Sequence, residues 1–137
     1  MATVSSCMSR RGVQQQLDAV LPWESDLAGT AWTLTGLYDL DTAKFAGASI
    51  SFDDTGCRVW GNGGCNTFSG YYLLRENNDI LLATLVFTRK MCLNDNAEAQ
   101  FAKALNYTET YSINGDTLKF YDIDKIPIAT FQKIKRF

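Results

Sequence analysis

The 137-residue sequence contains no histidine. This absence removes the commonest general base, the usual Ser–His and Cys–His nucleophile pairs, and most catalytic zinc sites. The sequence also lacks a run of 18 or more apolar residues and an apolar segment near its N-terminus of the kind found in secretory signals. We therefore expect a protein that is not an enzyme and that has no transmembrane segment.

An excess of basic residues is missing as well. Thirteen Lys and Arg residues stand against fifteen Asp and Glu residues, so the formal net charge is −2. Such a balance leaves no excess positive charge to neutralise a phosphate backbone, so nucleic-acid binding is not expected. The hydrophobic content of 46% in 137 residues predicts one compact domain.

The location of the protein is left open by its N-terminal residues. The sequence shows neither a signal peptide nor a lipidation motif, which favours the cytoplasm. Residues 1–17 contain Ser, Thr and Arg but no acidic residue before Asp18, a composition with a weak similarity to organellar transit segments.

The cysteines lack any CxxC spacing. A zinc ribbon and a thioredoxin-type motif are therefore not predicted, and neither is a metal ion or another cofactor. Without a signal sequence, free buried thiols are the favoured state of all four cysteines. They are Cys7, Cys57, Cys65 and Cys92.

Residues 1–26 form a separate N-terminal extension in this interpretation. Apolar residues between Gly12 and Leu21 recur at the spacing of one helix face, and Pro22 stops the pattern. A short amphipathic helix is predicted there. It either caps the main domain or docks on a partner, and capping is favoured.

From Leu27 onward the apolar residues mostly alternate with polar ones, which predicts strands joined by short turns. The segment from Ile80 to Phe87 is nearly all apolar and is predicted to be buried on both faces. Asp95 and Glu98 form a capping box for a helix of about three turns that follows it. The predicted strands span residues 32–38, 50–52, 57–61, 68–74, 80–87, 107–113, 117–123 and 126–134.

This order of elements predicts a mainly β (α+β) fold. We expect a small antiparallel β-barrel or half-barrel with one inserted helix and a short N-terminal helix. The glycine-rich residues 61–64 precede a strand rather than a helix, so a tight turn is favoured over a phosphate cradle. Paired aspartates at the predicted turns are interpreted as solvated turn residues.

The segment Gly63–Gly64–Cys65–Asn66–Thr67–Phe68–Ser69–Gly70–Tyr71 resembles the GCNxxxGxY signature of the META domain, or HslJ-like heat-shock protein, family. Further along, residues 88–92 resemble the Thr-x-x-x-Cys segment of that family. The resemblance covers most of the chain after the extension, and residues 27–137 are assigned to this domain. The residues that match the family motif are Gly64, Cys65, Asn66, Gly70, Tyr71, Thr88 and Cys92.

The resemblance implies a small barrel-like β fold and a non-enzymatic role, linked to heat shock and envelope stress in bacteria and to virulence in trypanosomatid parasites. It also singles out Cys65 and Cys92, which we hypothesise lie close together at one end of the sheet. They form either a disulfide or a pair of packed thiols, and a Cα separation above about 7 Å would rule out the disulfide.

Three functions remain open. The first is a stress- or virulence-associated module that binds a protein partner. The second is a β-barrel that holds a small apolar molecule among aromatic residues such as Trp32, Tyr38, Trp60 and Tyr72, although core packing is favoured for them. The third is a thiol redox element that uses Cys65 and Cys92.

Overall fold

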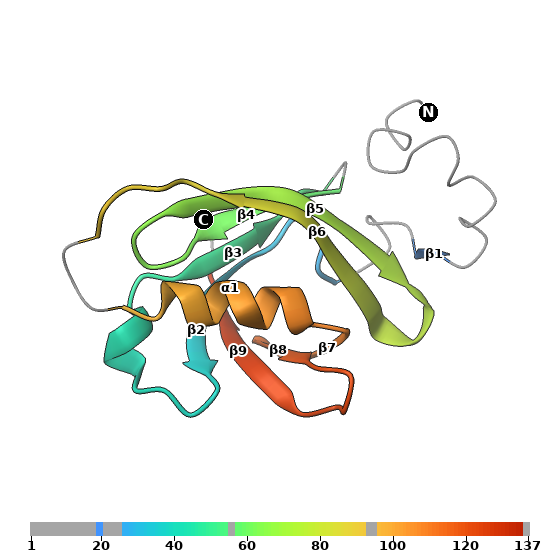
Figure 1. Cartoon of the computed structure of the whole chain (residues 1–137). Helices are drawn as coiled ribbons and strands as arrows, with labels where there is room; N and C mark the ends of the chain where they lie inside the picture. Colours follow the sequence, from blue (N-terminus) through green and yellow to red (C-terminus); the bar gives the residue numbers. More distant parts are fainter. Residues whose placement is uncertain (1–18, 21–25, 55–56, 93–95, 136–137) are drawn as a thin grey trace.

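The computed structural model describes residues 19–20, 26–54, 57–92 and 96–135 (Figure 1). Strands dominate these residues, and the one α-helix among them is α1 (Glu98–Tyr107). Two short 3-10 helices are η4 (Thr42–Phe45) and η5 (Glu76–Asn78). The strands are β1 (Ala19–Val20), β2 (Ala31–Leu37), β3 (Ser49–Phe52), β4 (Arg58–Asn62), β5 (Thr67–Arg75), β6 (Asp79–Phe87), β7 (Thr110–Asn114), β8 (Thr117–Tyr121) and β9 (Pro127–Lys133).

Within the described residues, eight antiparallel strands form a closed, barrel-like ring. Their order is β5, β4, β3, β2, β9, β8, β7 and β6, and the pairing of β6 with β5 closes the ring. The two residues of β1 pair with Leu74 and Arg75 of β5, beyond the end of β4. The prediction of a mainly β fold with one inserted helix is confirmed.

The alternation of apolar and polar residues along the strands builds the core. In β5, for example, Phe68, Tyr72 and Leu74 are buried while Tyr71 faces outward. Helix α1 lies between the two sides of the ring in Figure 1 and buries Phe101 against aromatic rings from both. The Phe101 ring centroid is 5.9 Å from that of Phe68 on β5 and 6.2 Å from that of Phe131 on β9.

Two local predictions differ from the structure, and a third falls almost entirely outside the described residues. Strand β6 is not buried on both faces, because Leu81 and Val86 are 43% and 64% exposed. Tyr107, predicted to open a strand, is the last residue of α1. The helix predicted over residues 12–21 lies almost entirely outside the described residues, and its two described residues, Ala19 and Val20, are in strand β1.

Within the ring, β6 and β7 share the shortest stretch of strand pairing. Among the described residues, one ladder pair joins these strands, Asp79 with Thr110, and the adjacent Ile80 N–H donates to the Glu109 carbonyl at 3.0 Å. The remainder of β6 therefore runs past α1 rather than along β7. In the described part of the chain, no helix is long and apolar enough to cross a membrane.

Candidate functional site

The turn between β4 and β5 carries the start of the motif and ends at Asn66. The Asn66 side chain is 6% exposed. Its Oδ1 accepts hydrogen bonds from Thr88 Oγ1 at 2.8 Å and from the Lys90 N–H at 2.7 Å. Its Nδ2 donates to Glu98 Oε2 at 2.9 Å and to the Lys90 carbonyl at 3.4 Å. All four hydrogen-bonding positions of the amide are thus used inside the protein.

Glu98, the first residue of α1, is hydrogen-bonded to the same turn through its carboxylate. Its Oε1 accepts hydrogen bonds from the backbone N–H groups of Cys65 at 3.1 Å and Asn66 at 2.7 Å. Hydrogen bonds to a carboxylate are stronger than those between neutral groups. The helix start is thereby fixed to the β4–β5 turn.

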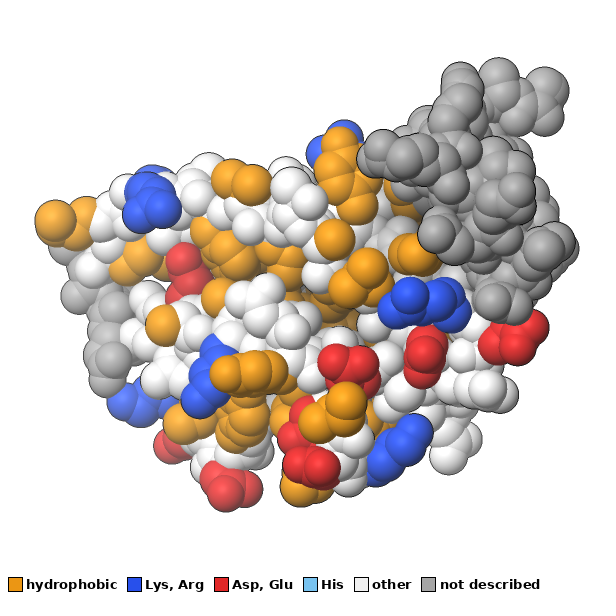
Figure 2. All heavy atoms as spheres, turned by 45° about the vertical axis from the view of Figure 1, so that its right-hand side comes forward, with side chains coloured by type: hydrophobic (Ala, Val, Ile, Leu, Met, Phe, Trp, Pro, Cys, Tyr) orange, Lys and Arg blue, Asp and Glu red, His pale blue; other side chains and the backbone are white. Residues whose placement is uncertain are grey.

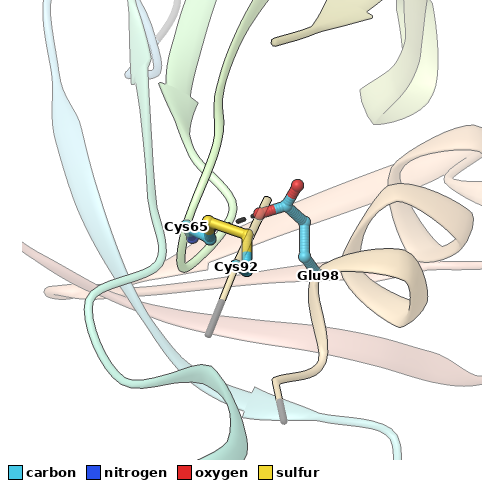
Figure 3. A group of neighbouring side chains, drawn as sticks. All are labelled: Cys65, Cys92 and Glu98. Carbon is cyan, nitrogen blue, oxygen red and sulfur yellow. Dashed lines mark hydrogen bonds between the residues drawn. A yellow bond between two sulfur atoms is a disulfide. The ribbon is translucent and has the colours of Figure 1, made fainter. Parts of the chain in front are cut away.

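Cys65 and Cys92 form a disulfide with a Cα separation of 6.1 Å, and Figure 3 shows the Glu98 carboxylate pointing toward this pair. That separation lies within the range that a disulfide can span. Cys57 is disulfide-bonded as well, and the described residues include no free cysteine. The free thiols favoured by the sequence are therefore not the state of the three described cysteines.

Two glycines let the turn fit against the helix. A Cβ atom on Gly63 would lie 2.8 Å from Glu98 Cγ, closer than side chains approach one another. Gly64 has a φ of +113°, a conformation that side chains disfavour, and its N–H donates to Asn62 Oδ1 at 2.7 Å. The glycine run thus serves a tight turn, as its sequence predicts.

We refer to Cys65, Asn66, Thr88, Cys92 and Glu98 as the Asn66 cluster. The ligand atoms of Cys65, Cys92 and Glu98 lie within 4.8 Å of one another, a spacing that would suit a metal ion. In a disulfide, however, the sulfurs are not thiolates, which are the form of cysteine that binds metals. The chemistry open to the oxidised cluster is thiol–disulfide exchange.

The motif residues do not all converge on this cluster. Gly70 lies further along β5, where a Cβ atom would be 2.8 Å from the Ala83 carbonyl oxygen on β6. Tyr71 is 43% exposed on the outside of the ring, and the Arg58 guanidinium lies 5.2 Å from its ring centroid. The motif therefore includes a cross-linked turn and a separate stretch of β5.

The aromatic residues considered for a small apolar ligand are divided between the core and the surface. Trp32 and Tyr72 are buried in the core, whereas Tyr38 and Trp60 are 41% and 45% exposed. None of the four side chains lines the three grooves found in the described part of the chain.

Sequence reasoning missed the role of Glu98. It predicted a capping box in which Glu98 reaches back to Asp95, but Asp95 lies outside the described residues and the N-cap of α1 is Ala97. The Glu98 N–H instead donates to Asn96 Oδ1 at 2.9 Å, and the Glu98 carboxylate crosses to the β4–β5 turn. A local pattern of four residues contains no signal for a partner 32 residues away.

Together, the eight-stranded ring and the cross-linked GCN turn define a small β domain built around one inserted helix. The META domain family pattern matches residues 25–135. The chain therefore belongs to the META domain family. In a comparison with curated proteins, no sequence matches this chain.

Solved structures share the fold at low sequence identity. The chain is similar to a protein from Burkholderia xenovorans solved by NMR, with a TM-score of 0.65 and 21% identity over 80% of this chain and 85% of that one. It is also similar to a DUF4847 family protein from Bacteroides vulgatus in a crystal structure, with a TM-score of 0.61 and 16% identity over 83% and 99% of the two chains. These similarities establish the fold alone.

Proposed function

We propose that this META domain is a non-enzymatic protein-interaction module associated with stress response or virulence. The main support is an exposed apolar surface on the outside of three neighbouring strands. We call it the outer patch, and its residues are Trp60 on β4, Tyr71 on β5, and Leu81 and Val86 on β6.

The register of the strands brings these side chains onto one face. Trp60 and Val86 lie on opposite sides of Ser69, which pairs with both. The four side chains are between 43% and 64% exposed. Large apolar side chains that gather on one exposed face of a sheet are a feature of contact sites.

The chemistry of the outer patch favours a protein surface as its partner. Aromatic residues and arginine are enriched in protein interfaces, and Arg58 lies directly over the Tyr71 ring. We therefore propose a partner with apolar side chains and a carboxylate opposite Arg58.

The non-enzymatic part of the proposal is supported by the Asn66 cluster. Its amide and carboxylate groups are already bonded to the backbone of neighbouring segments, and its sulfurs are bonded to each other. Such groups stabilise the domain rather than offering a base or a nucleophile to a substrate.

Affinity capture of the full chain from its own cells tests the interaction. We expect mass spectrometry to identify a protein that is lost when the outer patch is changed by Trp60→Ser together with Leu81→Thr. The matched control is Ile123→Thr, which removes an apolar side chain that is 74% exposed in the turn between β8 and β9. An identical set of captured proteins from all three chains would contradict the proposal.

The stress and virulence association requires a separate test in cells. Removing the protein should reduce survival after a heat or envelope stress, or reduce infectivity where the source organism is a pathogen. Restoring the wild-type chain, but not the outer-patch variant, should reverse the defect.

A thiol redox element is the second candidate, and the partly exposed Cys65–Cys92 disulfide favours it. The measurement is the reduction potential of this bond in glutathione buffers. A potential below about −300 mV would assign a structural role to the disulfide and remove this candidate.

A further inference from the structure

In the described part of the chain, the edge of β6 that faces α1 has no neighbouring strand after the bulge in β6. The register between β5 and β6 shifts between Ser69 and Tyr71, and Thr84 in β6 has a φ of +55°. Among the described residues, ladder pairing between β6 and β7 is confined to Asp79 and Thr110. Residues 85–87, at the end of β6, therefore present an open strand edge.

The backbone groups along this edge alternate in direction. Val86 pairs with Ser69, and the Thr88 N–H donates to the Thr67 carbonyl at 2.9 Å, so the backbone groups of Val86 and Thr88 face β5. In an antiparallel ladder the intervening residues face the opposite way. The N–H and C=O groups of Leu85 and Phe87 thus point away from β5, toward α1.

A groove of about 560 Å³ lies between this edge and the helix. Residues 85–89 line one side, and Glu98, Ala99 and Ala102 line the other. Leu85 and Phe87 are only partly buried. On the helix side, the small side chains of the two alanines leave the groove open. In Figure 2, hydrophobic side chains lie recessed between β6 and α1.

The charge at the end of the groove is positive. Arg89 lines it and is exposed, and the neighbouring Lys90 is exposed as well. The acidic residue of the lining, Glu98, already accepts hydrogen bonds from Cys65 and Asn66. An incoming carboxylate would therefore meet a basic end.

We propose that the groove binds an extended peptide segment of a partner protein, which adds to β6 as a further strand. The backbone of the segment pairs with Leu85 and Phe87, its apolar side chains contact Ala99 and Ala102, and an acidic residue lies near Arg89. Strand addition at an open sheet edge is a general mode of peptide recognition. This inference rests on the proposed interaction function, for which it names a second surface and a class of ligand.

Hydrogen exchange measured by NMR on the full chain tests the proposal. The probe is a pool of acetylated, amidated heptapeptides in which Val, Ile, Leu or Phe alternates with Thr and the last residue is Glu. We expect the amide exchange of Leu85 and Phe87 to slow at least tenfold on addition of the pool, while Val86, already paired with β5, changes little. Unchanged exchange of Leu85 and Phe87 at millimolar peptide would overturn the proposal.

Backbone N-methylation provides a matched control on the ligand side. Two versions of the best-binding peptide are methylated at alternate residues, so that each loses the donors of one edge. Because one edge pairs with β6, one version should lose at least tenfold in affinity and the other should keep most of it. Equal affinity of both versions would show that binding does not use a strand edge.

Substitutions on α1 provide the control on the protein side. Ala102→Tyr fills the groove and should reduce peptide affinity at least tenfold, whereas Gln100→Tyr, at an exposed position outside the lining, should not. Arg89→Ala should weaken binding of the Glu-containing peptides two- to fivefold and leave a Gln-containing version unchanged. Equal effects of the two tyrosine variants would contradict the proposed site.

Two other occupants of the edge are distinguishable. If the amides of Leu85 and Phe87 are protected from exchange in the free chain and this protection rises with protein concentration, a second copy of the chain occupies the edge. If they are protected at every concentration, another part of the same chain occupies it. Either result would show that the proposal is wrong. If the peptides do not bind but a partner is still captured through the outer patch, this inference alone is refuted. Failure to capture any partner would refute the proposed function independently.

Discussion

At the scale of single residues, Asn66 and Glu98 join three segments that are distant in the sequence. Asn66 lies in the β4–β5 turn, its acceptor oxygen is bonded to Thr88 and Lys90 after β6, and its donor is bonded to Glu98 on α1. A buried amide that lost these partners would leave several polar groups unsatisfied, at about 1–3 kcal/mol each. The cost explains why this side chain can fix the relative positions of the three segments.

Replacing Glu98 with glutamine tests the carboxylate. The new amide would keep one acceptor oxygen but lose the charge and place an NH2 group opposite the Asn66 amide. We expect Glu98→Gln to lower the free energy of unfolding by about 2 kcal/mol, measured by urea denaturation. Glu109→Gln, the same change at an exposed position, should alter it by less than about 0.5 kcal/mol. Equal effects would contradict the role assigned to Glu98.

Tyr72 predicts a pH dependence. Burial, with a smaller contribution from the carboxylates of Asp53 and Asp54, raises its pKa above the ordinary value of 10.0, and its hydroxyl donates to the Asp53 carbonyl at 2.8 Å. Because the folded state holds this proton more tightly than the unfolded state, the contribution of Tyr72 to stability should be constant below pH about 10 and fall as the pH rises above it.

The comparison variant for this prediction is Tyr72→Phe. It should lose about 1 kcal/mol at pH 8 through the missing hydrogen bond and show a shallower decline between about pH 9.5 and 11.5. Unfolding by urea at each pH measures both effects. A decline as steep as that of the wild type would show that other groups cause the alkaline loss.

At the scale of elements, strand β6 shows how a local pattern misled the prediction. Its apolar sequence from Ile80 to Phe87 is typical of a strand buried on both faces. In the structure, Ile80 and Leu82 face the core, while Leu81 and Val86 face outward. Apolar composition alone does not distinguish a buried outer face from an exposed one, because that depends on what covers the strand.

The bulge in β6 and Gly70 in β5 form one structural unit. A Cβ atom on Gly70 would lie 2.8 Å from the Ala83 carbonyl oxygen and 2.9 Å from that of Thr84. We expect Gly70→Ala to destabilise the protein by about 1–3 kcal/mol, since backbone atoms have to move. Thermal unfolding measures this, with Ser69→Ala on the same strand as the control. A stable Gly70→Ala variant would show that the bulge adjusts freely.

At the scale of the whole molecule, the Cys65–Cys92 disulfide closes the segment that contains β5 and β6. The two cysteines are 27 positions apart in the sequence. A loop of this length corresponds to about 3.5 kcal/mol of chain entropy in the unfolded state. The bond therefore supports the part of the ring that carries the open strand edge and, apart from Trp60, the outer patch.

Replacing both cysteines tests this contribution without a reductant, which would also act on Cys57. We expect Cys65→Ala with Cys92→Ala to lower the free energy of unfolding by about 3.5 kcal/mol while the ring still folds. The measurement is urea denaturation under non-reducing conditions. A loss below about 1 kcal/mol would mean that the unfolded chain is already compact in this region.

The sequence by itself determined the strands, the inserted helix, the tight glycine turn and, through a family resemblance, the importance of Cys65, Asn66 and Cys92. These features depend on alternation, turn residues and short motifs, all of which act over a few neighbouring positions. The tertiary structure decided the bond between the two cysteines, the role of Glu98 and the two surfaces left uncovered. Each of these depends on which distant segments meet when the ring closes, and a local pattern carries no information about that contact.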